Sequence, residues 1–415
     1  MEVCNFSSSS QFNYIMVEKL YLFILITSFG LTQNPPISDT KLSPDFGAGA
    51  RYPNMTVMNN GNLIVSWLEP GGKDTFHVKF SQYDGSTWNN PKTIISADNL
   101  FVNWADFPSV FHLGGNKLAA HWLQYAGSGV YEYDVHMKLS EDMGNTWSND
   151  LIPHSDRTLS EHGFVSFFEF PTGSHGLVWL DGRNMAVDDD LDNNGEMALY
   201  TTSISPEFSF GEDYPLDEMV CECCPTSALT FNDRVFIAYR NRETSELRNI
   251  HLLKYENGTW QDMEAIHNDG WKISGCPVNG PTLAANRDGI GIAWFTAPNG
   301  ETQVNFIMTK DLGNSFTKPM KLNDKEALGR VDITTFDNNF LVSWIEIDDQ
   351  KCNLVMREIT QMGKLSNKYS VDEIPCDRSS GNPKIEVYEK MLFVTWTITG
   401  DGIESRWLEL ESLFR

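Results

Sequence analysis

Seven apolar segments that each end in an aromatic residue recur along the chain at nearly constant intervals. The aromatic residues are Trp67, Trp122, Trp179, Tyr239, Trp294, Trp344 and Trp396. The intervals between them are 55, 57, 60, 55, 50 and 52 residues. Each interval holds several short alternating segments and no convincing helical run, which is typical of a β-propeller. The sequence therefore predicts an all-β fold with seven blades.

A turn rich in glycine, acids and hydroxyl residues recurs before the last strand expected in several units, as in "SEDMGNTW" at 140–147 and "SQYDGSTW" at 81–88. Glycine supplies positive φ, and the Asp, Ser and Thr side chains satisfy backbone amides within the turn. The recurrence predicts an architectural role. The last unit has only three strands, and residues 35–46 are the predicted outer strand that closes the ring and removes its exposed edges.

The N-terminal residues read as an export signal that starts late, with Met16, Lys19 and the apolar run from Leu20 to Leu31. We therefore expect a leader and upstream extension over residues 1–33 and one propeller domain over 34–415. The run is short for a membrane span, although an uncleaved anchor is the alternative. In an exported protein, the six cysteines outside the leader can form disulfides. The net charge of −25 argues against nucleic acid as a partner.

Strands in a blade alternate in direction, so residues that lead into the first strands and residues that follow the second strands lie on one face. Charge, cysteine and arginine concentrate on this predicted face. Its residues before the first strands include Arg51, Trp104, Asp106, Glu161, His162, Cys221, Cys223, Cys224, Cys276, Asn279, Arg330 and Arg378. Its residues after the second strands include Glu69, Tyr125, Tyr131, Asp181, Arg183, Arg240, Arg242, Arg248 and Glu346.

Many arginines near one axis repel one another unless acids or an anionic ligand compensate them. Guanidinium groups match a planar carboxylate, which favours an anionic or heavily hydroxylated ligand such as a glycan. The alternative is that some arginines only form ion pairs with acids close in sequence. These arginines are Arg183, Arg242 and Arg248, and the acids are Asp181, Glu243 and Glu246.

The "SxDxGxTW" turn resembles the Asp-box of the sialidase superfamily, and the chain is similar to that group over nearly all of its length after the leader. Catalytic sialidases are generally six-bladed, so the resemblance makes six blades the alternative. It also implies an exo-α-sialidase that grips the carboxylate of its sugar with three arginines. Arg51 in "ARYP" matches the first, and Arg240 and Arg330 are our choices for the others. The further predicted substrate-binding residues are Arg183, Arg242, Arg248, Asn279 and Arg378.

Glycoside hydrolysis needs a proton donor and a nucleophile or base on opposite sides of the scissile bond, and sialidases use a tyrosine as nucleophile. Asp106 is the predicted acid, with Glu161 and Asp181 as alternatives. The resemblance implies a nucleophilic tyrosine from a late blade, but the last two units place no tyrosine on this face. Tyr125 and Tyr131 in the second unit are the remaining candidates. The missing late tyrosine argues against a true sialidase.

Cysteines also gather on the predicted face. Strand direction places Cys352 and Cys376 on adjacent units, which predicts a disulfide. Cys276 is expected to pair with one of Cys221, Cys223 and Cys224. The alternative is a Cu(I) or Zn(II) site made by these four thiols, with His162 within reach. A separate acidic loop with Asp190, Asp192 and Asn194 resembles the first half of a calcium loop, and a solvated loop is the alternative.

Two functions remain open at this stage. The first is an exported sialidase-like glycoside hydrolase that acts as a monomer on a carboxylated sugar and requires no cofactor. The second is a non-catalytic propeller that binds a glycan, or a metal through its cysteines. The export signal places either one in the periplasm, outside the cell or at its surface.

Overall fold

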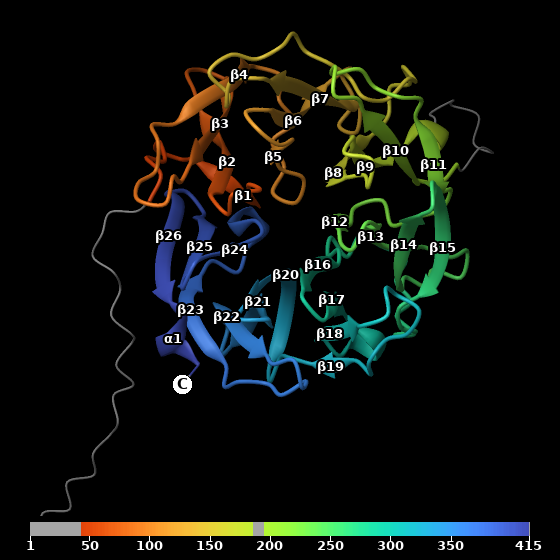
Figure 1. The fold of residues 1–415 in the computed structure, drawn as a ribbon, viewed down its shortest axis with the longest axis vertical. Helices are drawn as coiled ribbons and strands as arrows, with labels where there is room; N and C mark the ends of the chain where they lie inside the picture. Colours follow the sequence, from red (N-terminus) through yellow and green to blue (C-terminus); the bar gives the residue numbers. More distant parts are fainter. Residues whose placement is uncertain (1–42, 186–194, 415) are drawn as a thin grey trace, which may run out of the picture. The chain divides into compact units, whose positions relative to one another are not determined.

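The computed structural model of the chain describes residues 43–185 and 195–414, without the side chains of residues 262–264. These residues form seven antiparallel sheets, five with four strands and two with three. Figure 1 shows the sheets arranged as blades around one axis. The predicted seven-bladed, all-β propeller is confirmed, and the six-bladed alternative is wrong.

In every blade the chain runs through neighbouring strands in order, with the first strand nearest the axis (Figure 1). The first three blades comprise β1 (Arg51–Val57), β2 (Leu63–Pro70), β3 (Phe76–Gln82) and β4 (Lys92–Ala97); β5 (Ser109–His112), β6 (Leu118–Tyr125) and β7 (Tyr133–Ser140); β8 (His162–Glu169), β9 (His175–Asp181), β10 (Ala198–Ile204) and β11 (Tyr214–Asp217). The fourth and fifth comprise β12 (Ser227–Thr230), β13 (Val235–Arg240), β14 (Ile250–Glu256) and β15 (Thr259–Ala265); β16 (Thr282–Asn286), β17 (Gly289–Thr296), β18 (Gln303–Thr309) and β19 (Met320–Lys321). The last two comprise β20 (Glu326–Phe336), β21 (Asn339–Asp348), β22 (Lys351–Ile359) and β23 (Tyr369–Ile374); β24 (Lys384–Tyr388), β25 (Met391–Ile398) and β26 (Gly402–Glu409).

The second strand of each blade carries the recurring apolar segment because it is covered on both faces by neighbouring blades. All residues of β13 and β17 are buried, and in the other second strands most are. The aromatic residues that end the segments are at most 3% exposed. A strand buried on both faces reads as a continuous apolar run rather than an alternating one, which explains why the repeat is visible in the sequence.

The recurring turns join third and fourth strand positions, as predicted. In the turn after β7, the Asp142 carboxylate accepts hydrogen bonds from the backbone N–H and the hydroxyl of Thr146, at 2.8 and 2.7 Å. Asp311 makes the same two contacts with Ser315. Trp147 packs edge-on against Phe80 of the preceding blade at 5.8 Å. The turn aromatic therefore joins neighbouring blades, as well as fixing its own turn.

Two blades depart from four strands. In the second blade the expected fourth strand is reduced to one bridge between Leu151 and Met137, since Pro153 follows and lacks the N–H that continued pairing needs. In the seventh blade, residues 43–46 form no strand, although Ser43 hydrogen-bonds Ser405 at 2.8 Å. The rest of the predicted closing strand, 35–42, and the predicted leader, 1–33, lie outside the described residues.

Over residues 43–185 and 195–414, helical structure is limited to η1 (Arg183–Met185), η2 (Pro298–Gly300), η3 (Arg378–Ser380) and α1 (Leu410–Leu413). No helix within the described part of the chain is long and apolar enough to cross a membrane.

Candidate active site on the rim of the propeller

A cavity of about 660 Å³ lies where the chain approaches the innermost strands of blades two to five and seven. We call it the rim pocket. Its lining comprises Phe101, Asn103, Trp104, Ala105, Gly129, Val130, Tyr131, Glu132, Tyr133, Leu159, Ser160, Glu161, Phe164, Gly182, Met185, Glu222, Cys223, Cys276, Val278 and Arg378. These residues lie on the face that was predicted, from the alternating strand directions, to carry the charged residues and the cysteines. Of the seven large apolar side chains exposed among the described residues, four line this pocket: Val130, Tyr131, Leu159 and Met185. Exposed apolar groups concentrated at one cavity indicate a binding site.

Tyr133 and Glu161 form a hydrogen-bonded pair in the rim pocket, with the Tyr133 hydroxyl donating to Glu161 Oε1. Tyr133 is 1% exposed and stacks on Phe101 with ring centroids 3.9 Å apart, so its hydroxyl is held in place. Burial raises the pKa of Glu161 to about 7, helped by the charge of Glu222 and opposed by the Tyr133 hydrogen bond. A carboxyl group with this pKa can donate a proton near neutrality.

Glu222 supplies a second carboxylate to the rim pocket. It pairs with Arg242 through Oε1, and its Oε2 accepts a hydrogen bond from Arg248 Nη1 at 2.7 Å. Both arginines also pair with Glu246, and Arg242 pairs with Glu196. Two guanidinium groups therefore hold Glu222 by ion pairs, whereas Glu161 is partly buried and hydrogen-bonded to a tyrosine. The pocket thus holds two carboxyl groups in different electrostatic environments.

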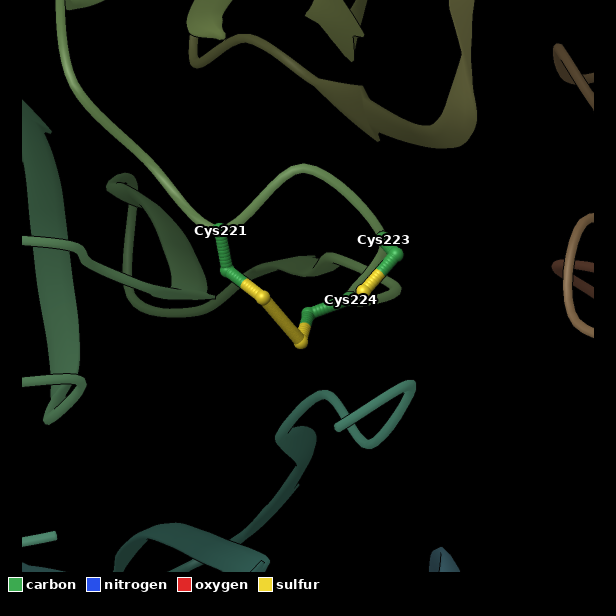
Figure 2. Close-up of side chains that lie close together, drawn as sticks. All are labelled: Cys221, Cys223 and Cys224. Carbon is green, nitrogen blue, oxygen red and sulfur yellow. A yellow bond between two sulfur atoms is a disulfide. The ribbon is translucent and has the colours of Figure 1, made fainter. Parts of the chain in front are cut away.

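Two free thiols, Cys223 and Cys276, meet in the same pocket. The hydrogen bond from the Cys223 thiol lowers the pKa of Cys276 to about 7, and the same contact together with burial raises the pKa of Cys223. Figure 2 shows Cys223 beside the disulfide between Cys221 and Cys224. The predicted disulfide from Cys276 to this group is wrong, because Cys221 and Cys224 pair with each other while Cys223 and Cys276 are both free thiols. The predicted Cys352–Cys376 disulfide is confirmed.

The three arginines predicted to grip a carboxylate do not converge. Arg240 is 1% exposed and donates to the carbonyl oxygens of Asn279, Arg248 and Phe295 at 3.0, 2.8 and 2.6 Å. Arg330 is equally engaged, with Ser380, Gly381 and Asp377 as acceptors.

Arg51 lies in a separate cavity with Tyr52 and Thr397. Its Nε donates to the Gly49 carbonyl. Of the predicted arginines, Arg378 is the one that lines the rim pocket, and it is exposed.

Three other residues predicted for the site, Asp106, Asn279 and Tyr125, lie outside the lining of the rim pocket. Asp106, the first choice for the acid, is 3% exposed, accepts a hydrogen bond from the Phe164 N–H at 2.8 Å and lines a separate axial cavity of about 260 Å³. Burial raises its pKa well above the usual range. Asn279 bridges Pro277, Leu328 and Arg330. Tyr125 packs on Phe101 outside the pocket lining.

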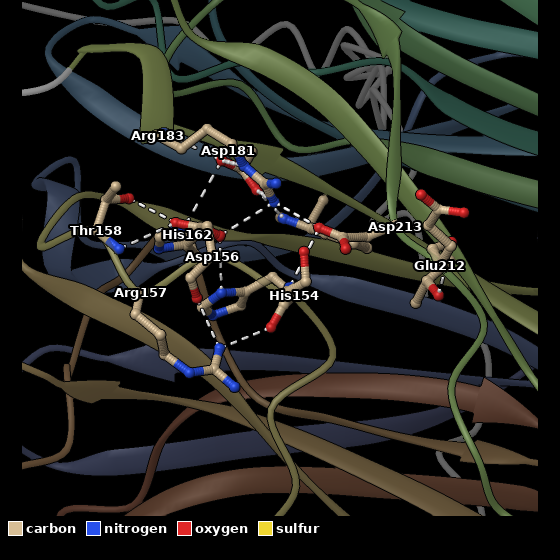
Figure 3. A network of polar contacts seen from close by, with 12 residues as sticks. His154, Asp156, Arg157, Thr158, His162, Asp181, Arg183, Glu212 and Asp213 are labelled. Atoms are coloured by element: carbon tan, nitrogen blue, oxygen red, sulfur yellow. Dashed lines mark hydrogen bonds and ion pairs between the residues drawn. The ribbon is translucent and has the colours of Figure 1, made fainter.

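Asp181, Arg183 and His162 belong to a buried polar network between the second and third blades (Figure 3). Arg183 Nη2 contacts Asp181, Asp213 and Asp156 at 2.6, 2.7 and 3.1 Å. Burial opposes a charge on His162, but hydrogen bonds to Asp134 and Asp156 outweigh it and raise the pKa of His162 to about 10. His162 is therefore placed with carboxylates, away from the cysteines. The residues predicted for calcium, Asp190, Asp192 and Asn194, lie outside the described residues.

Sequence reasoning missed two pocket residues, Glu222, which lies within the "CECC" segment, and Tyr133. Tyr133 opens the third strand of its blade, and strand direction places the start of a third strand on the same face as Glu161. The same argument had located Cys352, so the signal was available. It was overlooked because a tyrosine in "YEYDVHMKL" also reads as an ordinary strand aromatic.

No protein-family model and no curated protein matches the chain. Among solved structures, an ulvan lyase of polysaccharide lyase family PL25 is 11% identical with a TM-score of 0.56, over 88% of this chain and 94% of that one. The same type of lyase bound to -[GlcA(1-4)Rha3S]- is 12% identical with a TM-score of 0.55, over 88% and 95%. A Hadza microbial sialidase is 11% identical with a TM-score of 0.47, over 88% of this chain and 66% of its own length. At such identities the similarity to the two lyase structures shows a shared fold.

Proposed function

We propose that the chain is a glycoside hydrolase whose active site is the rim pocket. Glu161 is the proton donor, Tyr133 positions its carboxyl group, and Glu222 is the opposing nucleophile or base. The observation that carries the proposal is the Tyr133–Glu161 hydrogen bond at the wall of a cavity that also holds Glu222. Glycosidases pair a carboxylic acid with a carboxylate across the scissile bond, and here burial raises the pKa of Glu161 while Glu222 is paired with two arginines.

The pocket also suits a sugar by its size and surface. A volume of about 660 Å³ lies in the range of small-molecule sites. Trp104 and the exposed Tyr131 provide aromatic surface for the apolar face of a pyranose, and Asn103 and Ser160 offer hydrogen-bonding groups. The solved structures with this fold include enzymes named for action on polysaccharides, which agrees with this class of ligand.

The geometry supports glycoside cleavage better than a sialidase in particular. A carboxylated sugar would meet Glu132, Glu161 and Glu222, with Arg378 as the basic residue of the lining. Because the arginines predicted for the carboxylate are engaged elsewhere, we propose a neutral sugar as the substrate. Exo-α-sialidase activity is the competing specificity, and it depends on Arg378.

A panel of fluorogenic glycosides tests the proposal and its specificity. The purified protein is expected to hydrolyse at least one neutral α- or β-glycoside, and Arg378→Ala is expected to leave that rate unchanged. Cleavage of an α-sialoside, with KM raised about tenfold or more by Arg378→Ala because a charge-assisted contact is lost, would instead assign a carboxylated substrate. Absence of turnover over the whole panel would contradict the proposed activity.

A second candidate function, binding of a soft metal by thiolates, is favoured by the contact between Cys223 and Cys276. We expect iodoacetamide to label Cys276 in the native protein with a midpoint near pH 7, the value to which its pKa is lowered. Thiolates bind Cu(I) and Zn(II), so stoichiometric Cu(I) should block this labelling. Cys276→Ser is the control for site assignment. Labelling that is unaffected by Cu(I) or Zn(II) would rule out this candidate.

A further inference from the structure

Two stacked histidines lie at the centre of the buried network in Figure 3. The rings of His154 and His162 are parallel within 2°, with centroids 4.0 Å apart, and both side chains are fully buried. His154 comes from the segment between β7 and β8, and His162 begins β8. Neither residue is needed for the proposed hydrolysis, so the cluster requires its own explanation.

The two rings share carboxylates at both ends. At one end, Asp156 Oδ1 lies 3.1 Å from His154 Nδ1, and Asp156 Oδ2 lies 3.3 Å from His162 Nε2. At the other end, Asp134 Oδ1 lies 3.5 Å from His154 Nε2 and 3.4 Å from His162 Nδ1. The buried His154 Nε2 has no hydrogen-bond partner in this arrangement. A polar atom buried without a partner needs an explanation, which can be an ion.

The end at Asp156 is already supplied with positive charge. Arg183 Nη2 contacts Asp156 at 3.1 Å and Asp181 at 2.6 Å. By contrast, within the described residues no arginine or lysine pairs with Asp134, whose ion-pair partners are the two histidines. His162 Nδ1 also lies 3.3 Å from the Tyr133 carbonyl oxygen, so a hydrogen on this nitrogen serves both that carbonyl and Asp134, whereas His154 Nε2 has no such partner. A cation that replaced this hydrogen would face three acceptors, namely the two ring nitrogens and the Asp134 oxygen.

A proton on His162 serves Asp134 and the Tyr133 carbonyl but leaves His154 Nε2 without a partner, and an additional proton on His154 would place two imidazolium charges 4.0 Å apart. We propose that Asp134, His154 and His162 bind a zinc ion, with Asp156 holding the outer nitrogens of both histidines. A carboxylate behind a ligating histidine is the usual arrangement around protein-bound zinc. Zinc binds histidine nitrogen and carboxylate oxygen as well as thiolate, and its bond lengths separate two tetrahedral ligand atoms by about 3.4 Å.

The separations of Asp134 Oδ1 from the two histidine nitrogens fit that value, and all three ligand atoms lie within 4.8 Å of one another. The lone pair of each nitrogen lies in its ring plane, so binding of one ion by both rings inclines them away from the parallel stack. Asp134 follows Tyr133 and His162 follows Glu161. The ion would therefore anchor the two segments that present the pair in the rim pocket.

Metal analysis of the full chain tests the site independently of glycoside hydrolysis. After incubation with zinc and desalting, the wild-type protein is expected to retain about one zinc per chain. Asp134→Asn and His154→Ala should lose it. Asp213→Asn, a matched change in the same network on the far side of Arg183, should retain it, as should Cys223→Ser with Cys276→Ser. Chelation of the wild type should lower its Tm.

Cobalt substitution of the wild type keeps the test decisive if the ligand variants fail to fold. Cobalt bound by His and Asp gives visible d–d bands without the near-ultraviolet charge-transfer band of a cobalt–thiolate bond, and this spectrum would support the site. A thiolate band, or loss of zinc from the cysteine variants, would move the metal to the rim cysteines and overturn the proposal. Wild-type protein that retains no zinc after desalting would overturn it as well.

Discussion

Glu161→Gln is expected to lower kcat on the substrate found in the glycoside panel by about 10²- to 10⁴-fold, the usual contribution of a general acid. Glutamine keeps the size of the side chain and accepts the Tyr133 hydrogen bond but has no acidic proton. In the wild type, kcat should fall as the pH rises through about 7, because Glu161 must be protonated to act and its pKa is raised to about 7. The Glu161→Gln variant should lack this alkaline limb.

Tyr133→Phe separates positioning from a purely structural role. The Tyr133 hydrogen bond lowers the pKa of Glu161, so removing the hydroxyl should move the alkaline limb to higher pH while lowering kcat. A structural defect alone would not displace the limb. The control is Glu243→Gln, an exposed glutamate outside the rim pocket, which should behave as wild type. Wild-type rates for Glu161→Gln would show that another group donates the proton.

Arg240→Met is expected to reduce the free energy of unfolding by about 3 kcal/mol or more. Methionine preserves the apolar stem but leaves the carbonyl oxygens of Asn279, Arg248 and Phe295 without the donor that reaches them. Each buried acceptor that loses its partner costs about 1–3 kcal/mol. Stacking of the guanidinium on Trp271 at 5.0 Å is also lost. The midpoint and slope of urea unfolding measure the change.

Arg378→Ala is the matched comparison, because this arginine is exposed and lines the rim pocket. Its free energy of unfolding should stay within about 0.5 kcal/mol of the wild type, as is usual for surface substitutions. If Arg240→Met unfolded like the wild type and instead weakened sugar binding, Arg240 would belong to the substrate site after all.

The contrast among the arginines shows where sequence reasoning ends. Arg51, Arg240 and Arg330 occupy positions that lead into or follow inner strands, and the resemblance to sialidases pointed to them on that basis. In the structure, Arg240 and Arg330 fill gaps between blades and donate to backbone carbonyls. From the same place in a repeat, a guanidinium group can bind a substrate carboxylate or donate to backbone carbonyls. Only the loops around it decide whether its donors meet carbonyl oxygens or an open site.

The cysteines also show which contacts strand direction predicts and which depend on loop paths. Strand direction was enough to bring Cys352 and Cys376 together, because both lie at strand ends of adjacent, regular blades. Cys221, Cys223, Cys224 and Cys276 sit in irregular loops. Their pairing depends on the path of those loops, and the structure joins Cys221 to Cys224 while leaving Cys223 and Cys276 as thiols.

The sequence by itself determined the seven blades, the recurring turns and the face on which polar and reactive residues gather. Burial of each second strand between blades, and hydrogen bonds within each turn, involve residues at short and regular separations. The residue types that they require therefore recur periodically in the sequence. Only the tertiary structure decided that Tyr133 meets Glu161, that Glu222 is held by Arg242 and Arg248, and that His154 stacks on His162. These contacts join side chains from different strands and loops, and their distances depend on loop paths that no period in the sequence encodes.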